Sequence, residues 1–127
     1  MKQKFIGTKT VMAEPMTAEV AIKKGYRVNG NTDGYEVEYE DGYKSWSPAD
    51  AFNKAYKPAE TPLDRLRIER DELAVRLDKL KRTLEEHPYI SISQRHLMKF
   101  QYGTMIVYHD ILDDRIMDLQ TLYPYDR

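Results

Sequence analysis

The sequence predicts an α+β protein: a small antiparallel β module with two short helices, followed by a long antiparallel helical hairpin. Apolar and acidic residues alternate over residues 35–40 and precede Asp41-Gly42, a pattern typical of a β-hairpin. Two later segments carry apolar residues at alternating spacings of three and four, which is typical of helices packed side by side. The short linker around Pro58 places the β module in residues 1–58 and the helical hairpin in residues 59–127.

The β module is expected to begin with a strand over residues 5–12, which are rich in β-branched side chains. This strand should end before Glu14-Pro15, because proline cannot donate a hydrogen bond to a β ladder. Thr17 can then cap a short helix over residues 18–24. Lysines followed by Gly25 suit the C-terminus of that helix.

A β-hairpin is expected next. Tyr35, Val37 and Tyr39 form its apolar face, and the glutamates between them make the opposite face acidic. Asp41-Gly42 favours a tight turn with positive φ, and residues 43–46 return as the second strand.

A second short helix should follow directly, with Ser47 at its N-cap and Pro48 in its first turn. Phe52 and Tyr56 share one face of this helix and should cover the hairpin. Two interpretations stay open for the aromatic residues of the hairpin. They can stack on a base or cage a cation, or they can form the face of a small sheet that packs on the helix. These aromatic residues are Tyr35, Tyr39, Tyr43 and Trp46.

The first long helix should have Thr61 as its N-cap, Pro62 at its first position and Asp64 in its first turn. We expect it to end at His87-Pro88, because a residue before proline is disfavoured in the α region. Its apolar positions form one seam with charged flanks, as in a coiled-coil strand. This seam comprises Leu63, Leu66, Arg70, Leu73, Leu77, Leu80 and Leu84.

The second long helix should span residues 93–119, with Ser93 or Ser91 as its N-cap. The seam expected to face the first helix comprises Met98, Gln101, Met105, Tyr108, Leu112, Arg115 and Leu119. Gln101 and Arg115 either find polar partners supplied by a ligand or a second subunit, or lie at the edge of the seam with their heads in water. A neighbouring row widens the apolar arc and comprises Leu97, Phe100, Thr104, Val107 and Ile111. One partner helix cannot cover an arc of that width, so we expect a homo-oligomer.

Antiparallel pairing of the two seams places Arg70 within about one helical turn, ~5 Å, of Arg115. Two like charges on one seam destabilise the fold unless a negative group accompanies them. Two alternatives remain open. The negative group can be a carboxylate of this chain, from Asp64, Glu69 or Asp118, or it can be an anionic ligand.

The composition argues against several functions. The 20 Lys and Arg residues balance 21 Asp and Glu residues, which argues against binding of nucleic-acid polymers. With 0 cysteines, no disulfide, thiol nucleophile or thiolate metal site is possible. We expect no membrane interaction, because no segment resembles a signal peptide or is apolar enough to span a bilayer. The expected compartment is therefore intracellular.

No catalytic motif is present, because the chain lacks a nucleophile elbow and a glycine-rich phosphate loop. We therefore expect a protein that is not an enzyme and has no cofactor. We also expect no metal site. His87, His96 and His109 form no i, i+4 pair with one another and no cluster with carboxylates on a shared face. Asp110 and Asp114 beside His109 should lie on a solvated surface.

Gly103 is unusual, because glycine inside a helix costs about 1 kcal/mol relative to alanine. Such a glycine indicates a close approach, either by another helix or by a flat ligand. The cationic, amide, aromatic and thioether groups around it are of the kinds that bind nucleotides. The candidate ligand-binding residues are Arg95, Lys99, Gln101, Tyr102, Gly103, Met105, Tyr108 and Arg115.

Residues 101–105 and 111–116 resemble the helical hairpin shared by two groups of phage anti-defence proteins. These groups are the anti-CBASS cyclic-dinucleotide sponges and the first-described Thoeris anti-defence sponges. Residues 5–9 and 34–48 are similar to the front module of small phage proteins of the Thoeris type. Together the two resemblances cover most of the chain.

The resemblance implies a non-enzymatic protein of the host cytoplasm that sequesters bacterial immune signals without cleaving them. The implied ligands are cyclic ADP-ribose isomers and cyclic di- or trinucleotides, held in pockets between the subunits of a dimer-based hexamer. The alternative is a coiled-coil assembly or adaptor protein that binds no small molecule.

Overall fold

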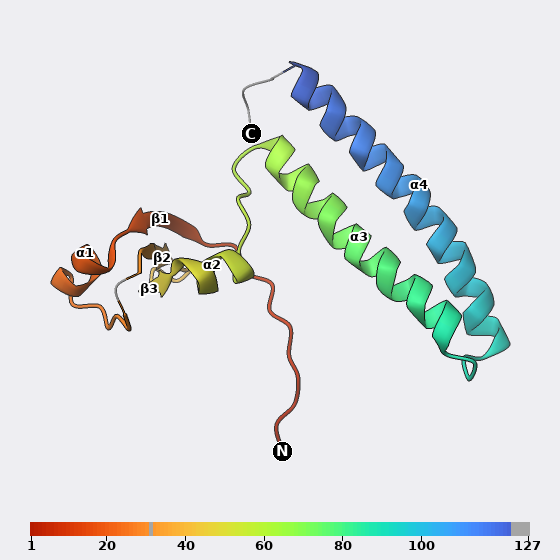
Figure 1. Ribbon diagram of the computed structural model, residues 1–127, viewed down its shortest axis with the longest axis horizontal. Helices are drawn as coiled ribbons and strands as arrows, with labels where there is room; N and C mark the ends of the chain where they lie inside the picture. The colour runs from red at the N-terminus through yellow and green to blue at the C-terminus, as the bar shows by residue number, and fades with distance from the viewer. Residues whose placement is uncertain (31, 123–127) are drawn as a thin grey trace. The chain divides into compact units, whose positions relative to one another are not determined.

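The computed structural model describes residues 1–30 and 32–122, which form two compact units, Met1–Lys57 and Pro58–Arg127 (Figure 1). The first unit contains β1 (Met12–Met16), α1 (Ala18–Lys23), β2 (Gly34–Glu38), β3 (Lys44–Pro48) and α2 (Ala49–Ala55). The second unit contains the long helices α3 (Pro62–Glu86) and α4 (Ile92–Leu122). The α+β fold class predicted from the sequence is therefore confirmed.

The three strands form one antiparallel sheet in the order β1-β2-β3, so β2 is the central strand. The first strand differs from its prediction: β1 covers Met12–Met16, whereas residues 5–11 are not in a strand. Pro15 lies inside β1, opposite Tyr35. A proline is tolerated there because β1 is an edge strand, where one side of the backbone needs no ladder partner.

The hairpin between β2 and β3 is confirmed. Tyr39 N donates to Tyr43 O over 2.9 Å, and Gly42 N donates to Tyr39 O over 2.9 Å. Gly42 adopts the expected positive φ of 87°. The second strand of this hairpin, β3, extends beyond residue 46, where it was expected to end. Ser47 therefore belongs to β3 and does not cap α2.

The N-cap of α2 is therefore Pro48, which makes no side-chain capping hydrogen bond. Ala49 N, at the start of α2, instead donates to Asp33 O over 3.1 Å. A backbone carbonyl from the preceding loop thus replaces the capping side chain that the sequence suggested.

Aromatic side chains attach α2 to the sheet, as expected. The rings of Tyr35 and Phe52 stack with their centroids 4.2 Å apart, and Tyr56 lies 5.1 Å from Phe52. Trp46 donates from Nε1 to Met16 O over 3.0 Å. These contacts give Tyr35 and Trp46 a packing role, which favours the simpler of the two interpretations for these two residues.

Gly34 is required where Trp46 crosses the sheet. A Cβ at this position would lie 2.1 Å from Ser47 O and 2.7 Å from the indole ring of Trp46. Both distances are shorter than van der Waals contact, so any side chain would displace the strand or the indole.

Glu36 is the buried charged residue of the first unit, with 8% of its surface exposed. Its Oε2 accepts a 2.7 Å hydrogen bond from the Tyr26 hydroxyl and a 3.4 Å bond from Lys24 Nζ. The Tyr26 hydrogen bond lowers the pKa of Glu36, with a further contribution from Lys24, although burial opposes the change. The predicted acidic face of β2 is thus partly internal.

The long helices start and end largely as the capping residues predict. Thr61 and Asp64 form a capping box, in which Asp64 N donates to Thr61 Oγ1 over 3.0 Å. The first helix ends at Glu86, just before His87-Pro88. At the next helix Gln94 N donates to Ser91 Oγ over 3.1 Å, so Ser91 caps α4 and the alternative Ser93 does not.

Helices α3 and α4 lie side by side and antiparallel (Figure 1). The apolar core between them comprises Leu63, Leu66, Leu73, Leu112 and Ile116, with Leu77, Met105 and Leu119 packed against it. The expected antiparallel pairing of the seams agrees with this core.

The seam of α4 differs from its prediction at alternate positions. Gln101, Tyr108 and Arg115 are exposed, which for Gln101 and Arg115 agrees with the interpretation that their heads lie in water. The buried or half-buried positions of the observed seam are Met98, Tyr102, Met105, His109, Leu112, Ile116 and Leu119, and Arg95 and Asp113 beside it are also half-buried. A helix advances about 100° per residue. From Met98, Met105 or Leu112, a step of three residues therefore leads to one flank of α4 and a step of four residues leads to the opposite flank. The apolar side chain at Ile116 decides in favour of the flank that excludes Arg115.

Candidate functional site

A second apolar surface lies on α4, away from α3. We define this outer face by residues Leu97, Phe100, Gly103, Thr104, Val107 and Ile111. Phe100 is 69% exposed, Val107 58% and Ile111 50%. Their spacings of three and four repeat the rhythm of the buried seam, so the outer face is suited to a further helix or another partner surface.

Gly103 lies in the middle of the outer face. A Cβ built on Gly103 would meet no atom of the described chain within 4 Å. The close approach predicted for this glycine is therefore not made by α3. A partner that approaches Gly103 would have to come from outside the helical hairpin.

Arg95 is engaged at the end of the hairpin. Its Nη1 donates to Leu84 O over 2.8 Å and its Nη2 donates to His87 O over 2.7 Å. Both acceptors are carbonyls at the C-terminus of α3, where a cation is favoured by the helix dipole. The guanidinium therefore joins the two helices across their connection, a role that the sequence analysis missed.

The other candidate ligand-binding residues point in different directions around α4. Tyr102 and Met105 are half-buried on the side of α3. Tyr108 is on the flank and donates its hydroxyl to Glu69 of α3. Gln101 and Arg115 share that flank at heptad spacing and are exposed.

Lys99 and Gly103 lie four residues apart on the outward side of α4, and both are exposed. The eight candidates therefore do not converge on one pocket within a single hairpin. A pocket that used most of them would have to combine surfaces from more than one copy of the chain.

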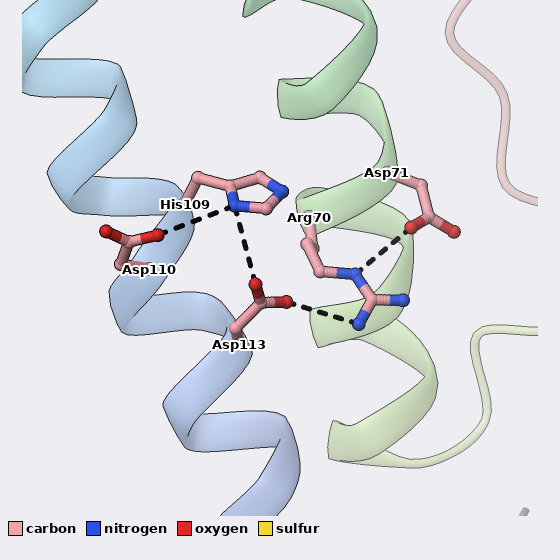
Figure 2. Close-up of polar contacts among 5 residues, drawn as sticks. All are labelled: Arg70, Asp71, His109, Asp110 and Asp113. Atoms are coloured by element: carbon pink, nitrogen blue, oxygen red, sulfur yellow. Dashed lines mark hydrogen bonds and ion pairs between the residues drawn. The ribbon is translucent and has the colours of Figure 1, made fainter.

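Arg115, expected beside Arg70, is exposed and lies outside the observed seam. Arg70 is instead paired with two carboxylates (Figure 2). Its Nη1 lies 3.3 Å from Asp113 Oδ1, and its Nε lies 3.2 Å from Asp71 Oδ1. Of the two alternatives for Arg70, a carboxylate of the same chain is therefore present.

This carboxylate is not one of the predicted candidates, Asp64, Glu69 or Asp118. Asp113 was missed because the incorrect seam turned it away from α3. The i, i+4 spacing of His109 and Asp113 is the signal in the sequence that could have located it. His109 Nδ1 lies 3.5 Å from Asp113 Oδ2 and 4.0 Å from Asp110 Oδ1 (Figure 2).

A separate open pocket lies in the first unit, near the turn of the β-hairpin. Its lining residues are Thr8, Lys9, Thr10, Tyr39, Glu40, Asp41 and Tyr43. The rings of Tyr39 and Tyr43 stack at 5.9 Å, and Lys9 Nζ lies 4.9 Å from the centre of the Tyr39 ring. Tyr39 thus already has a cation over its face, supplied by the chain itself.

Helices α3 and α4 define the class of protein, which is a helical hairpin. One face of α4 packs against α3, and a second, apolar face of α4 is exposed and suited to contact with another surface. Residues 60–118, which cover α3 and most of α4, match the model of a protein family described as Sequestin. No curated protein and no solved structure matches the chain.

The name Sequestin suggests that proteins of this family sequester a ligand. The match fits a sponge-type anti-defence protein, as the resemblance in the sequence suggested. None of the described helices has the length and hydropathy needed to cross a membrane.

Proposed function

We propose that this protein is a non-enzymatic phage anti-defence sponge. It binds and sequesters cyclic nucleotide immune signals, namely cyclic ADP-ribose isomers or cyclic di- or trinucleotides, in the host cytoplasm. Lowering the free concentration of the signal would block Thoeris or CBASS immunity. The observation that carries this proposal is the Sequestin match over α3 and α4. Helix α4 also bears the outer face and Gly103.

Assembly is part of the proposal. A second copy that covers the outer face would remove exposed apolar side chains such as Phe100 and Ile111 from water, which is favourable at about 25 cal/mol per Å². The candidate ligand-binding residues lie on several sides of α4, so they can converge only between copies. We therefore propose a homo-oligomer built from dimers, with a hexamer as the expected form.

The exposed groups on α4 suit a phosphorylated ring. Arg115 and Lys99 offer cations to phosphate oxygens, and the guanidinium of Arg115 can bind them in a bidentate manner. Gln101 offers an amide to a base edge. The bare backbone at Gly103 leaves room for a flat group against the helix.

Isothermal titration calorimetry against cyclic ADP-ribose isomers, cyclic dinucleotides and cyclic trinucleotides tests the proposal. We expect tight binding of at least one of them, and chromatography should recover that ligand chemically unchanged after heat release. Arg115→Ala should weaken binding, whereas Arg76→Ala, which removes an exposed arginine from α3, should not. Hydrolysed product in excess of the protein, or no binding by any member of the panel, would contradict the proposal.

A coiled-coil assembly or adaptor protein is the second candidate, and the exposed heptad-like row on the outer face is the observation that favours it. The two candidates differ in thermal denaturation. A ligand at a hundredfold excess over its dissociation constant adds about 2.7 kcal/mol to the apparent stability. An adaptor without a ligand would melt at the same temperature with every nucleotide.

A further inference from the structure

Three potential metal ligands lie close together on two successive turns of α4 (Figure 2). They are the imidazole of His109 and the carboxylates of Asp110 and Asp113, whose ligand atoms all lie within 4.8 Å of one another. The Nδ1 atom of His109 faces both carboxylates, at 4.0 Å and 3.5 Å. Ligands at about 2.0–2.2 Å from an ion lie roughly 3–4 Å apart, so small side-chain rotations would bring these atoms around one ion.

The sequence predicts no metal site, because His109 was expected to share no face with a carboxylate and to lie on a solvated surface. The structure differs on both points. His109 is instead 25% exposed at the edge of the hairpin core, and Asp113 lies one turn further on the same face. Asp113 is 43% exposed, so a hydrated ion can reach the cluster from solvent.

Arg70 orients the cluster from the opposite helix. Its Nη1 bonds Asp113 Oδ1, which leaves Oδ2 directed at the imidazole (Figure 2). Carboxylates that ligate a metal are commonly held in this way by a second hydrogen-bonding group. Asp113 can therefore serve Arg70 with one oxygen and an ion with the other.

The charges around the cluster also favour a dication. Asp71 and Asp113 both pair with the guanidinium of Arg70, and Asp110 lies beside His109, so these three carboxylates and one guanidinium leave two negative charges uncompensated when His109 is neutral. A divalent ion would neutralise this excess.

We propose that His109, Asp110 and Asp113 bind one divalent transition-metal ion, with His109 Nδ1 and one oxygen of each carboxylate as ligands. The imidazole favours Zn²⁺, Co²⁺ or Ni²⁺ over Ca²⁺ and Mg²⁺, which prefer sets of oxygen ligands, and the two carboxylates also suit Mn²⁺. Three protein ligands leave coordination positions open to water. The site ties two successive turns of α4 and stabilises a helix that already folds through its apolar core.

The test is thermal denaturation of the full chain with ZnCl₂ or MnCl₂, compared with the chain in EDTA. We expect the metal to raise the melting temperature. His109→Gln removes one of the three proposed ligands and should abolish this increment. Asp110→Asn is the second variant, because Asp110 is 74% exposed and makes no bond to Arg70, so its loss leaves the hairpin intact. Asp114→Asn makes the same change of charge at an exposed neighbour and should keep the full increment.

Paramagnetic broadening by Mn²⁺ in NMR spectra locates the ion independently. Broadening should centre on the amides of residues 109–113 and disappear in His109→Gln. No melting increment and no broadening at millimolar metal would overturn the proposal. An increment that survives in His109→Gln, or broadening centred on His87 or His96, would overturn it as well.

Discussion

The hydroxyl of Tyr26 donates a 2.7 Å hydrogen bond to the buried carboxylate of Glu36 and thereby joins the segment after α1 to the central strand β2. This bond lowers the pKa of Glu36 below its usual 4.5 and raises the pKa of Tyr26 above its usual 10.0. A carboxyl group whose pKa is lowered on folding stabilises the fold above its unfolded pKa. That contribution is lost as the pH falls through the folded value.

Tyr26→Phe should therefore destabilise the first unit at neutral pH and flatten the loss of stability below about pH 4.5. Trp46 is the single tryptophan of the chain, so its fluorescence reports unfolding of this unit directly. Tyr89→Phe is the matched control, because Tyr89 is 99% exposed and lies in the other unit. Equal acid sensitivity in Tyr26→Phe and the unaltered protein would show that Glu36 does not depend on this bond.

Arg95→Gln should destabilise the hairpin by about 1 kcal/mol or more, because it leaves the carbonyls of Leu84 and His87 without a charged donor. Urea denaturation followed by helical circular dichroism measures the change. Lys99→Gln removes a nearby exposed cation and should alter stability little. If Arg95→Gln lowered nucleotide affinity and left stability unchanged, Arg95 would be a ligand-binding residue in the way the sequence suggested.

Ile111→Asp should dissociate the proposed oligomer without unfolding the hairpin. Ile111 is half exposed in the single chain, so the change costs the monomer little, whereas a charge buried at an interface is strongly destabilising. Sedimentation equilibrium at micromolar concentration measures the mass. Val75→Asp places the same charge at a similarly exposed apolar position of α3 and should leave the mass unchanged. A monomeric mass for the unaltered protein would contradict assembly through the outer face.

Gly103→Ala distinguishes the intrinsic cost of glycine from its use at a contact. A Cβ there meets open space in the single chain, so alanine should stabilise the helix by about 1 kcal/mol in the monomeric Ile111→Asp background. In the assembling protein the same change should weaken association or nucleotide binding. A stabilised Gly103→Ala protein that assembles and binds normally would mean that nothing approaches this backbone.

Features set by a few neighbouring residues could be predicted from the sequence. Asp41-Gly42 fixes the β-turn through the positive φ of Gly42, and Thr61 with Asp64 fixes the start of α3. Such patterns depend only on local backbone chemistry. Pro15 shows the limit, because proline forbids a central strand and permits an edge strand, and the order of strands is decided by contacts between distant residues.

The flank of α4 that faces α3 is a further case in which local pattern was insufficient. The anchors Met98, Met105, Leu112 and Leu119 belong to both possible seams, so their spacing alone cannot choose between Arg115 and Ile116. Burying an arginine is far more costly than burying an isoleucine, and that comparison of energies, rather than periodicity, predicts the observed side. The Arg70–Asp113 pair and the His109 cluster both follow from that side.

The two faces of α4 separate two equilibria that respond differently to protein concentration. Packing of the inner face against α3 is intramolecular and is complete in a single chain, however dilute. Covering of the outer face by another copy would follow mass action and would fail below the dissociation constant of the assembly. If ligand pockets form between copies, a cell with little of this protein would contain folded hairpins with no capacity for the signal. Capacity would then rise more steeply than the amount of protein, which would give the onset of protection a threshold in expression level.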